Sequence, residues 1–327
     1  MIDKASAIEV RDLRKGFEDL LAVNDISFTV RRGELFGFLG PNGAGKTTTI
    51  NLLTGLARPD SGEIRIGGGD CIPRPKEAQR LIGVVPDESN LYPELTGFDN
   101  LCFCGALYGM GKEERRPRAR QLLEDFGLAE AAERKFAGYS RGMKRRLAIA
   151  AGIIHRPRIL FLDEPTTGID VAGARVIRRL IADLHRSGTT VFLTTHYIEE
   201  AERLCDRVAF IVGGRIVGID TVARFIQPVR EKRVLQVSCL NLPDGIREVL
   251  AGSFPDLEFP SLSEGMIRVE ADGPVPVGPL VRFLEERGAE VTEARRVRPS
   301  LEDVFVRITG IAAGAMEKEK EKKGGGR

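Results

Sequence analysis

A glycine-rich loop with a single lysine joins two apolar segments near the N-terminus, in "GFLGPNGAGKTTTINLLTG" (residues 37–55). It satisfies every position of the template G-x-x-x-x-G-K-[ST], whose glycines let backbone N–H groups turn toward bound phosphates. "ELFGFLG" before the loop predicts a buried strand, and "KTTTINLLTG" predicts a helix whose N-terminus faces the anion. Lys46 would reach the β- and γ-phosphates, and the Thr47 hydroxyl would ligate Mg²⁺. The predicted phosphate-binding residues are Gly40, Pro41, Asn42, Gly43, Ala44, Gly45, Lys46, Thr47 and Thr48.

Two carboxylates follow a second apolar strand, "RILFLDEP" (residues 158–165). Ligands of open α/β sheets collect at the carboxyl ends of the strands, so Asp163 is expected to hold Mg²⁺ and Glu164 to polarise an attacking water. His196 ends the next strand, "TVFLTTH", and is expected to contact the γ-phosphate. Lys46, Glu164 and His196 are therefore the predicted catalytic residues. The alternative is a strand that simply ends in charges.

A second anion site is indicated by "AGYSRGMKRRLAIAAGI" (residues 137–153). Ser140 stands where an N-cap would begin a helix, with Gly142 two residues later. A serine hydroxyl, a glycine N–H and the positive end of a helix dipole together suit a terminal phosphate.

Composition restricts the class of protein. The chain has 327 residues, 42% of them hydrophobic and 29% charged, and its net charge of +2 predicts no polyanion-binding field, so nucleic acid is not an expected partner. Five cysteines without a CxxC spacing favour reduced thiols in a cytosolic compartment. The N-terminal "MIDKASAIEV" lacks an apolar signal region, and no apolar run reaches about 18 residues. We therefore expect a chain that is neither secreted nor membrane-spanning by itself.

The order of the patterns predicts an α/β fold. A strand-rich N-terminal region with turns expected at Gly16 and "RRG" precedes the phosphate loop, and a helical block at about residues 96–157 interrupts the parallel-sheet segments. Residues 1–228 are predicted to form this first domain. Residues 229–310 read as β-α-β-β-α-β, a small ferredoxin-like α+β domain, and the charged tail 311–327 is expected to be disordered.

Taken together, "GPNGAGKT", "YSRGM", "ILFLDEP", "TGID" and His196 resemble, in order and spacing, the Walker A, signature, Walker B, D-loop and H-loop motifs of the ABC transporter ATPases. The resemblance covers residues about 8–225. It implies a P-loop NTPase (RecA-like) core that uses ATP and Mg²⁺. It also implies a nucleotide sandwich, in which Ser140 and Gly142 of one subunit complete the ATP site of a second copy or a paralogous cassette. Phe17 matches the aromatic position that stacks on adenine in this family; the alternative is a core phenylalanine.

Two positions depart from the family pattern. Asp87 replaces the usual glutamine after the "VVP" strand, and a carboxylate there can still bind a hard cation, so Asp87 is predicted as a third metal ligand beside Thr47 and Asp163. The usual LSGGQ reads "YSRGM", with Arg141 and Met143 at altered positions.

The C-terminal residues, with "RPSLEDVFVRITG", resemble the accessory domain of daunorubicin-resistance exporters. That resemblance implies an ATPase that powers export through a separate multi-spanning permease, from the cytoplasmic face of the membrane. Leu91, Tyr92, Leu95 and Phe98 are predicted to bind the permease; the alternative is that they pack within the helical block. Two other functions remain open from the sequence: a soluble non-transport ABC ATPase, and a nucleotide-binding module with little hydrolysis.

Overall fold

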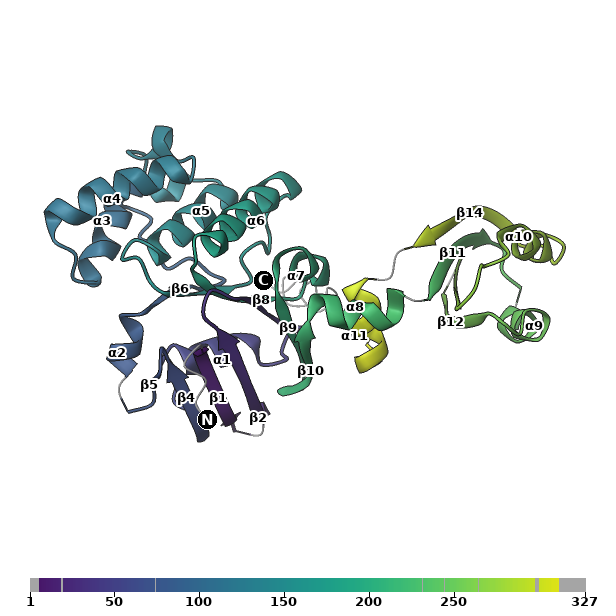
Figure 1. Ribbon diagram of the computed structural model, residues 1–327. Helices are drawn as coiled ribbons and strands as arrows, with labels where there is room; N and C mark the ends of the chain where they lie inside the picture. Colours follow the sequence, from purple (N-terminus) through teal and green to yellow (C-terminus); the bar gives the residue numbers. More distant parts are fainter. Residues whose placement is uncertain are drawn as a thin grey trace. The chain divides into compact units, whose positions relative to one another are not determined.

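A computed structural model describes residues 6–18, 20–73, 75–230, 232–243, 245–263, 265–297 and 300–311. The chain divides into two compact units (Figure 1). The first ends at Thr221 and takes in the residues from Ile308, and the second comprises Val222–Arg307. The predicted tail, apart from Ile311, lies outside the described residues.

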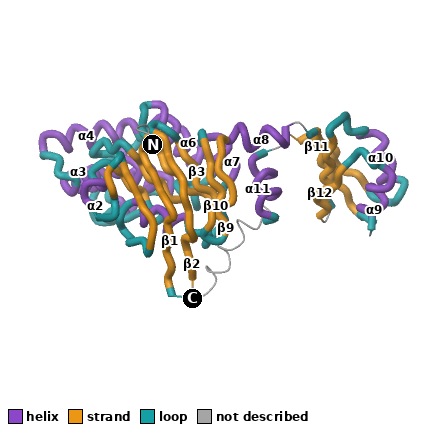
Figure 2. Tube along the Cα trace, turned by 60° about the horizontal axis from the view of Figure 1, so that its bottom comes forward, coloured by secondary structure: helices purple, strands orange, loops and turns teal. Residues whose placement is uncertain are grey.

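An antiparallel sheet opens the first unit, with strand order β2-β1-β4-β5. Its long strands β1 and β2 run side by side in Figure 2. The predicted turn at Gly16 is wrong. Gly16 pairs with Leu21 across the two strands, and its N–H donates to the Asp60 carboxylate at 2.7 Å, so the backbone stays extended there. The strands are β1 (Ser6–Phe17), β2 (Leu20–Arg31), β4 (Ser61–Ile66) and β5 (Gly69–Asp70).

A six-stranded sheet, order β10-β9-β3-β8-β7-β6, carries the motifs. All neighbours pair in parallel except β10, which is antiparallel to β9. Three of the central strands are buried along their whole length because both faces of a parallel sheet are covered. The strands are β3 (Leu35–Leu39), β6 (Ile82–Val85), β7 (Ile159–Asp163), β8 (Thr190–Thr195), β9 (Arg207–Val212) and β10 (Arg215–Thr221).

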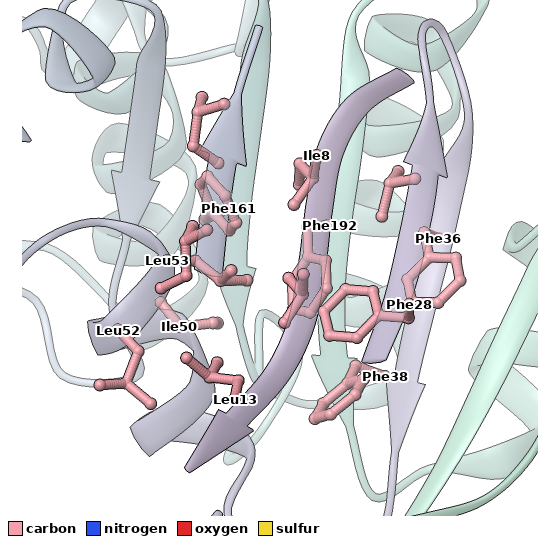
Figure 3. Packing of buried hydrophobic residues seen from close by; sticks show 14 of the residues in the cluster. Ile8, Leu13, Phe28, Phe36, Phe38, Ile50, Leu52, Leu53, Phe161 and Phe192 are labelled. Carbon is pink, nitrogen blue, oxygen red and sulfur yellow. The ribbon is translucent and has the colours of Figure 1, made fainter. Parts of the chain in front are cut away.

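The two sheets share one hydrophobic core, which also includes helix α1 (Lys46–Leu53). Phe28 of β2 packs against Phe36, Phe38 and Phe192 of the six-stranded sheet, with ring centroids 5.7 to 6.0 Å apart (Figure 3). These contacts hold the strand that precedes the phosphate loop in a rigid layer.

The helical block follows β6 and ends before β7, where the helical pattern predicted it. Thr96 and Ser140 cap its helices α3 and α5, since each side chain accepts a hydrogen bond from a backbone N–H three residues later. The helices of the block are α3 (Gly97–Leu107), α4 (Lys112–Asp125) and α5 (Arg141–Gly152), with short 3₁₀ turns at Ala129–Ala131 and Phe136–Gly138. The other helices of the unit are α2 (Pro75–Gln79), α6 (Val171–Arg186) and α7 (Ile198–Leu204).

The second unit is built on a four-stranded antiparallel sheet, order β12-β13-β11-β14. Its elements between α8 and α11 follow the predicted order β-α-β-β-α-β. Helices α9 and α10 cover the same face of the sheet, where they share a hydrophobic core with it (Figures 1 and 2). The elements are α8 (Val222–Arg230), β11 (Arg233–Leu240), α9 (Ile246–Ser253), β12 (Glu258–Ser263), β13 (Met266–Ala271), α10 (Val277–Glu285), β14 (Glu290–Val297) and α11 (Leu301–Thr309). In none of the described ranges is a helix long and apolar enough to cross a bilayer.

Candidate nucleotide site

The sheet register brings three predicted segments to one edge. Leu39, at the end of β3, pairs with Thr195 of β8, and Asp163, at the end of β7, pairs with Thr194. The phosphate loop, the Asp163–Glu164 pair and His196 therefore all begin where parallel strands end. This is the edge at which open α/β sheets bind ligands.

The loop's backbone demands glycine at its last turn. Gly45 has φ +103°, and a Cβ there would lie 2.3 Å from the Ala22 carbonyl oxygen, so an alanine would clash with the backbone of β2. Gly45 is the N-cap of α1, and its own helix supplies no side chain to satisfy the first N–H groups. The Asn42 side-chain nitrogen is buried without a hydrogen-bond partner. The loop thus presents donors that an anionic ligand would satisfy.

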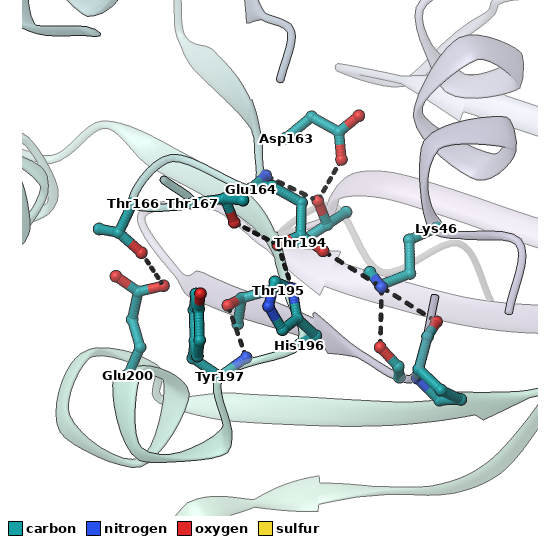
Figure 4. Close-up of polar contacts among 12 residues, drawn as sticks. Lys46, Asp163, Glu164, Thr166, Thr167, Thr194, Thr195, His196, Tyr197 and Glu200 are labelled. Carbon is teal, nitrogen blue, oxygen red and sulfur yellow. Dashed lines mark hydrogen bonds and ion pairs between the residues drawn. The ribbon is translucent and has the colours of Figure 1, made fainter. Parts of the chain in front are cut away.

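Lys46 is buried and points into this loop (Figure 4). Its Nζ donates to the Gly40 carbonyl at 2.7 Å and to the Pro41 carbonyl at 3.1 Å, and it lies 3.2 Å from Glu164 Oε1. The lysine charge is therefore compensated by groups of the site itself.

Asp163 is bound by two hydroxyls. Thr47 Oγ1 donates to Asp163 Oδ2 at 2.8 Å, and Thr194 Oγ1 donates to the other carboxylate oxygen. A hydroxyl and a carboxylate this close are hard oxygen donors of the kind that Mg²⁺ accepts. The residues present therefore fit the predicted metal.

Glu164 is the centre of the polar cluster. It lies in the left-handed region with φ +49°, and its N–H donates to the Thr194 carbonyl at 3.1 Å. Its Oε2 accepts from Thr167 Oγ1 at 2.9 Å and contacts His196 Nδ1 at 2.6 Å. Burial alone would raise the pKa of Glu164, but the His196 hydrogen bond and the Lys46 charge outweigh it and lower the pKa to about 2.

The ionisation of Glu164 decides the role of His196 in this contact. A carboxylate with a pKa of about 2 is ionised at neutral pH and can only accept hydrogen bonds. His196 Nδ1 must therefore carry the proton and donate to Glu164. His196 is itself buried beside the Tyr197 ring. The structure thus brings Lys46, Thr47, Asp163, Glu164 and His196 into one chain of contacts.

Four other predicted residues lie on other elements. Ser140, exposed at the start of α5, accepts a hydrogen bond from the Met143 N–H at 3.3 Å, and Gly142 is the second residue of that helix. Phe17, at the end of β1, is 50% exposed beneath the Lys15 ammonium, so it is not a core residue. Asp87 is exposed just after β6.

Arg145 is a further residue of the site that no sequence motif indicates. Its buried guanidinium donates to the carbonyls of Pro86, Asp87, Asp163 and Pro165. The sequence shows it only as one of three consecutive basic residues in "MKRRL", and no local pattern separates it from its neighbours.

Comparison with known proteins agrees with this geometry. A family model described as "ABC transporter" matches residues 23–167. The chain is 34% identical over 306 residues to the linearmycin resistance ATP-binding protein LnrL of Bacillus subtilis (strain 168), covering 93% of this chain and 98% of the relative. It is 37% identical over 314 residues to the doxorubicin resistance ATP-binding protein DrrA of Mycobacterium tuberculosis (strain CDC 1551 / Oshkosh), covering 93% of both.

Among solved structures, the fold is similar to a dimeric ATP-binding cassette in a post-hydrolysis state bound to ADP and Pi. The TM-score is 0.60 at 27% identity, and the match covers 65% of this chain and 98% of that one. The relatives match nearly the whole chain at more than 30% identity, and the P-loop fold carries the family's motifs in place. The chain belongs to the ABC transporter ATP-binding family, whose members are ATPases coupled to transport.

Proposed function

We propose that this chain is the motor subunit of an exporter and that Lys46, Glu164 and His196 form the hydrolytic centre of its ATP site. The observation that carries the proposal is the contact chain in which Lys46 and His196 hold opposite oxygens of Glu164, beside the Thr47–Asp163 pair. A lysine in a phosphate loop and a carboxylate at the adjacent strand end are the groups that phosphoryl transfer to water requires.

The lysine contacts suggest how binding activates the site. When ATP enters, Lys46 exchanges the Gly40 and Pro41 carbonyls and Glu164 for phosphate oxygens. Transfer of the lysine contact from Glu164 to the phosphates weakens one cause of the low pKa of Glu164, so the carboxylate becomes a stronger base. The donated hydrogen bond from His196 keeps the carboxylate oriented while the other oxygen turns to the water.

Thr47 and Asp163 are proposed to hold Mg²⁺, with Asp87 as a further oxygen donor. The ion supplies charge neutralisation for the β- and γ-phosphates. The Thr194 hydroxyl, which donates to Asp163, keeps one carboxylate oxygen turned away so that the other faces Thr47. Phe17 is proposed to stack on adenine, which its exposure allows.

A second cassette, either another copy or a paralogue, is proposed to complete the site with its own Ser140 and Gly142. In the described structure these residues stand at an exposed helix start whose first turn carries no acidic side chain. Resemblance to a dimeric cassette bound to ADP and Pi supports this arrangement.

Export is supported by the relatives that are named for resistance to linearmycin and doxorubicin. We propose a separate permease that holds the chain at the cytoplasmic face of the membrane. Of the predicted anchors, Leu91 and Phe98 are buried and Leu95 is partly buried, which favours their alternative role in packing within the helical block. Tyr92 is 50% exposed and packs edge-to-face on the exposed Phe103 at 5.0 Å, which makes this pair the proposed contact with the permease.

The test is membrane fractionation of the chain expressed with and without its permease. The chain should sediment with membranes only when the permease is present, and the double variant Tyr92→Ala, Phe103→Ala should lose that association. Leu56→Ala removes another exposed apolar side chain and should retain it. Sedimentation without a permease, or full association of the folded double variant, would remove the docking proposal.

A further inference from the structure

Arg145 joins three backbone segments that belong to different parts of the site. Its Nε donates to the Pro165 carbonyl at 3.0 Å, and Nη2 donates to the Asp163 carbonyl. Its Nη1 donates to the carbonyls of Pro86 and Asp87, the latter at 3.2 Å. One guanidinium therefore connects α5, the end of β6 and the turn that contains Glu164.

The turn after β7 is also held by Glu200 of α7. Thr166 Oγ1 donates to Glu200 Oε2 at 3.1 Å, as Figure 4 shows. Glu164 belongs to this turn and has a positive φ, a conformation that costs free energy for a non-glycine residue and persists only where the surroundings impose it. The carbonyl contacts of Arg145 on both sides of Glu164 are part of that constraint.

Arg146, the next residue of α5, gives a matched comparison. Its Nη1 also donates to two carbonyls, of Phe126 at 2.8 Å and Gly127 at 3.1 Å. Both of these belong to the end of α4, inside the helical block. Two adjacent arginines of one helix thus make the same kind of contact, but only Arg145 reaches the sheet edge.

We propose that Arg145 is a positioning residue that couples the start of α5, where Ser140 and Gly142 would meet the partner's nucleotide, to Asp87 and Glu164 of its own site. The inference rests on the two-cassette site proposed above. Ser140 and Arg145 lie five residues apart on one helix, so a displacement of its N-terminus moves the guanidinium as well. The backbone of Asp87 and Glu164 then follows the occupancy of the neighbouring site.

This coupling requires a side chain with several hydrogen-bond donors that point in different directions. Guanidinium has five N–H donors in a fixed plane and can bind carbonyls on three sides, whereas an ammonium is a single point of charge. Arg145→Lys therefore keeps the charge and loses the simultaneous contacts. A shift of about 1 Å in a reacting group can cost up to about 100-fold in rate, so the lysine variant should turn over ATP at least about 10-fold more slowly.

The experiment compares Arg145→Lys with Arg146→Lys in the full chain, using ATPase kinetics and amide hydrogen exchange. We expect Arg145→Lys to lower kcat with KM for ATP changed less than about twofold, and to speed exchange at residues 163–167 and 87–89. Arg146→Lys should speed exchange at 126–128 and leave kcat near wild type. If Arg145→Lys does not fold, Arg145→Gln, which retains two donors, replaces it with the same expectations.

Equal kcat in the two variants, or faster exchange at 163–167 without a change in kcat, would overturn the positioning role. A different result would reject the proposal that a second cassette completes the site. In that case the specific ATPase activity of wild type and variants alike would not depend on protein concentration, because no second cassette would be needed. Concentration-dependent activity with no difference between the variants would instead reject only the inference about Arg145.

Discussion

Each of the two units contains an arginine embedded in polar contacts, and the partners of the two arginines differ. In the second unit, Arg268 pairs with Glu270 at 2.9 Å and Asp303 at 2.6 Å, and Arg307 pairs with the same Glu270 at 3.1 Å. In the first unit, Arg145 donates to four backbone carbonyls. One arginine is neutralised by carboxylates, and the other is bound by neutral dipoles.

The consequence is visible in the two pKa shifts. Burial lowers the pKa of Arg145 despite the nearby charges of Asp87 and Asp163. Burial also acts to lower the pKa of Arg268, but its paired carboxylates reverse the effect and raise it. In the second unit, these charged side chains therefore pair with one another and link β13 to α11. In the first unit, Arg145 binds the backbone, and the carboxylates of Asp163 and Glu164 instead contact Thr47, Lys46 and His196 of the site.

Of the substitutions that test this difference between the two units, Glu164→Gln should have the largest effect. An amide cannot take a proton from water, so turnover should fall by at least about 100-fold, the usual contribution of a general base. ATP binding should persist, because Lys46 and the loop are unchanged. Single-turnover hydrolysis and equilibrium ATP binding measure the two properties. Lys46→Ala is the opposite control and should lose binding itself, and undiminished hydrolysis in the glutamine variant would remove Glu164 from its role.

Arg268→Ala should destabilise the second unit alone. Removing one member of a partly buried ion cluster leaves Glu270 and Asp303 partly uncompensated, at a cost of about 2 kcal/mol, between the values for exposed and buried pairs. Hydrogen exchange should accelerate across β11 and β13, while ATP binding by the first unit is unchanged. Arg295→Ala, which removes an exposed arginine of β14, should change stability by less than about 0.5 kcal/mol. Loss of ATP binding in Arg268→Ala would contradict the separation of the two units.

Acid titration should affect the first unit through Glu164. Its pKa is lowered from 4.5 to about 2 in the folded, ligand-free protein. This stabilisation, on the order of 3 kcal/mol, is present above the unfolded-state pKa and is lost as the pH falls from about 4.5 toward 2. Denaturant unfolding at pH 6 and pH 3 should therefore show a smaller loss for Glu164→Gln than for wild type. Equal losses in both proteins would count against a native carboxylate held by Lys46 and His196.

The smallest expected effect concerns Phe17. Stacking of a base on an aromatic ring contributes about 1–3 kcal/mol, so Phe17→Ala should weaken ATP binding about tenfold. Because the ring is half exposed, stability should change by no more than about 0.5 kcal/mol. Leu20→Ala is the matched control, since Leu20 is also exposed and pairs with Phe17 across β1 and β2. Equal ATP affinities in the two variants would exclude stacking on Phe17.

The sequence alone determined the local structural features of this protein, such as turns, helix starts and strand ends. Gly45 at a left-handed turn, Ser140 at a helix start and apolar strands that end at Asp163 and Thr195 all follow from short-range rules of backbone conformation, capping and burial. The same rules recovered the β-α-β-β-α-β order of the second unit. They failed at Gly16, where pairing with Leu21 overrides the turn tendency of glycine.

Only the tertiary structure decided which side chains meet. Lys46 contacts Glu164 across more than a hundred residues, and Arg145 reaches carbonyls just after β6 and at the end of β7, because the parallel register aligns the ends of those strands. It also distinguished Tyr92, which is half exposed, from Phe98, which is buried beneath Arg116 and Arg120 of α4. Contacts of this kind depend on strand register and packing between distant segments, and no short stretch of sequence carries that information.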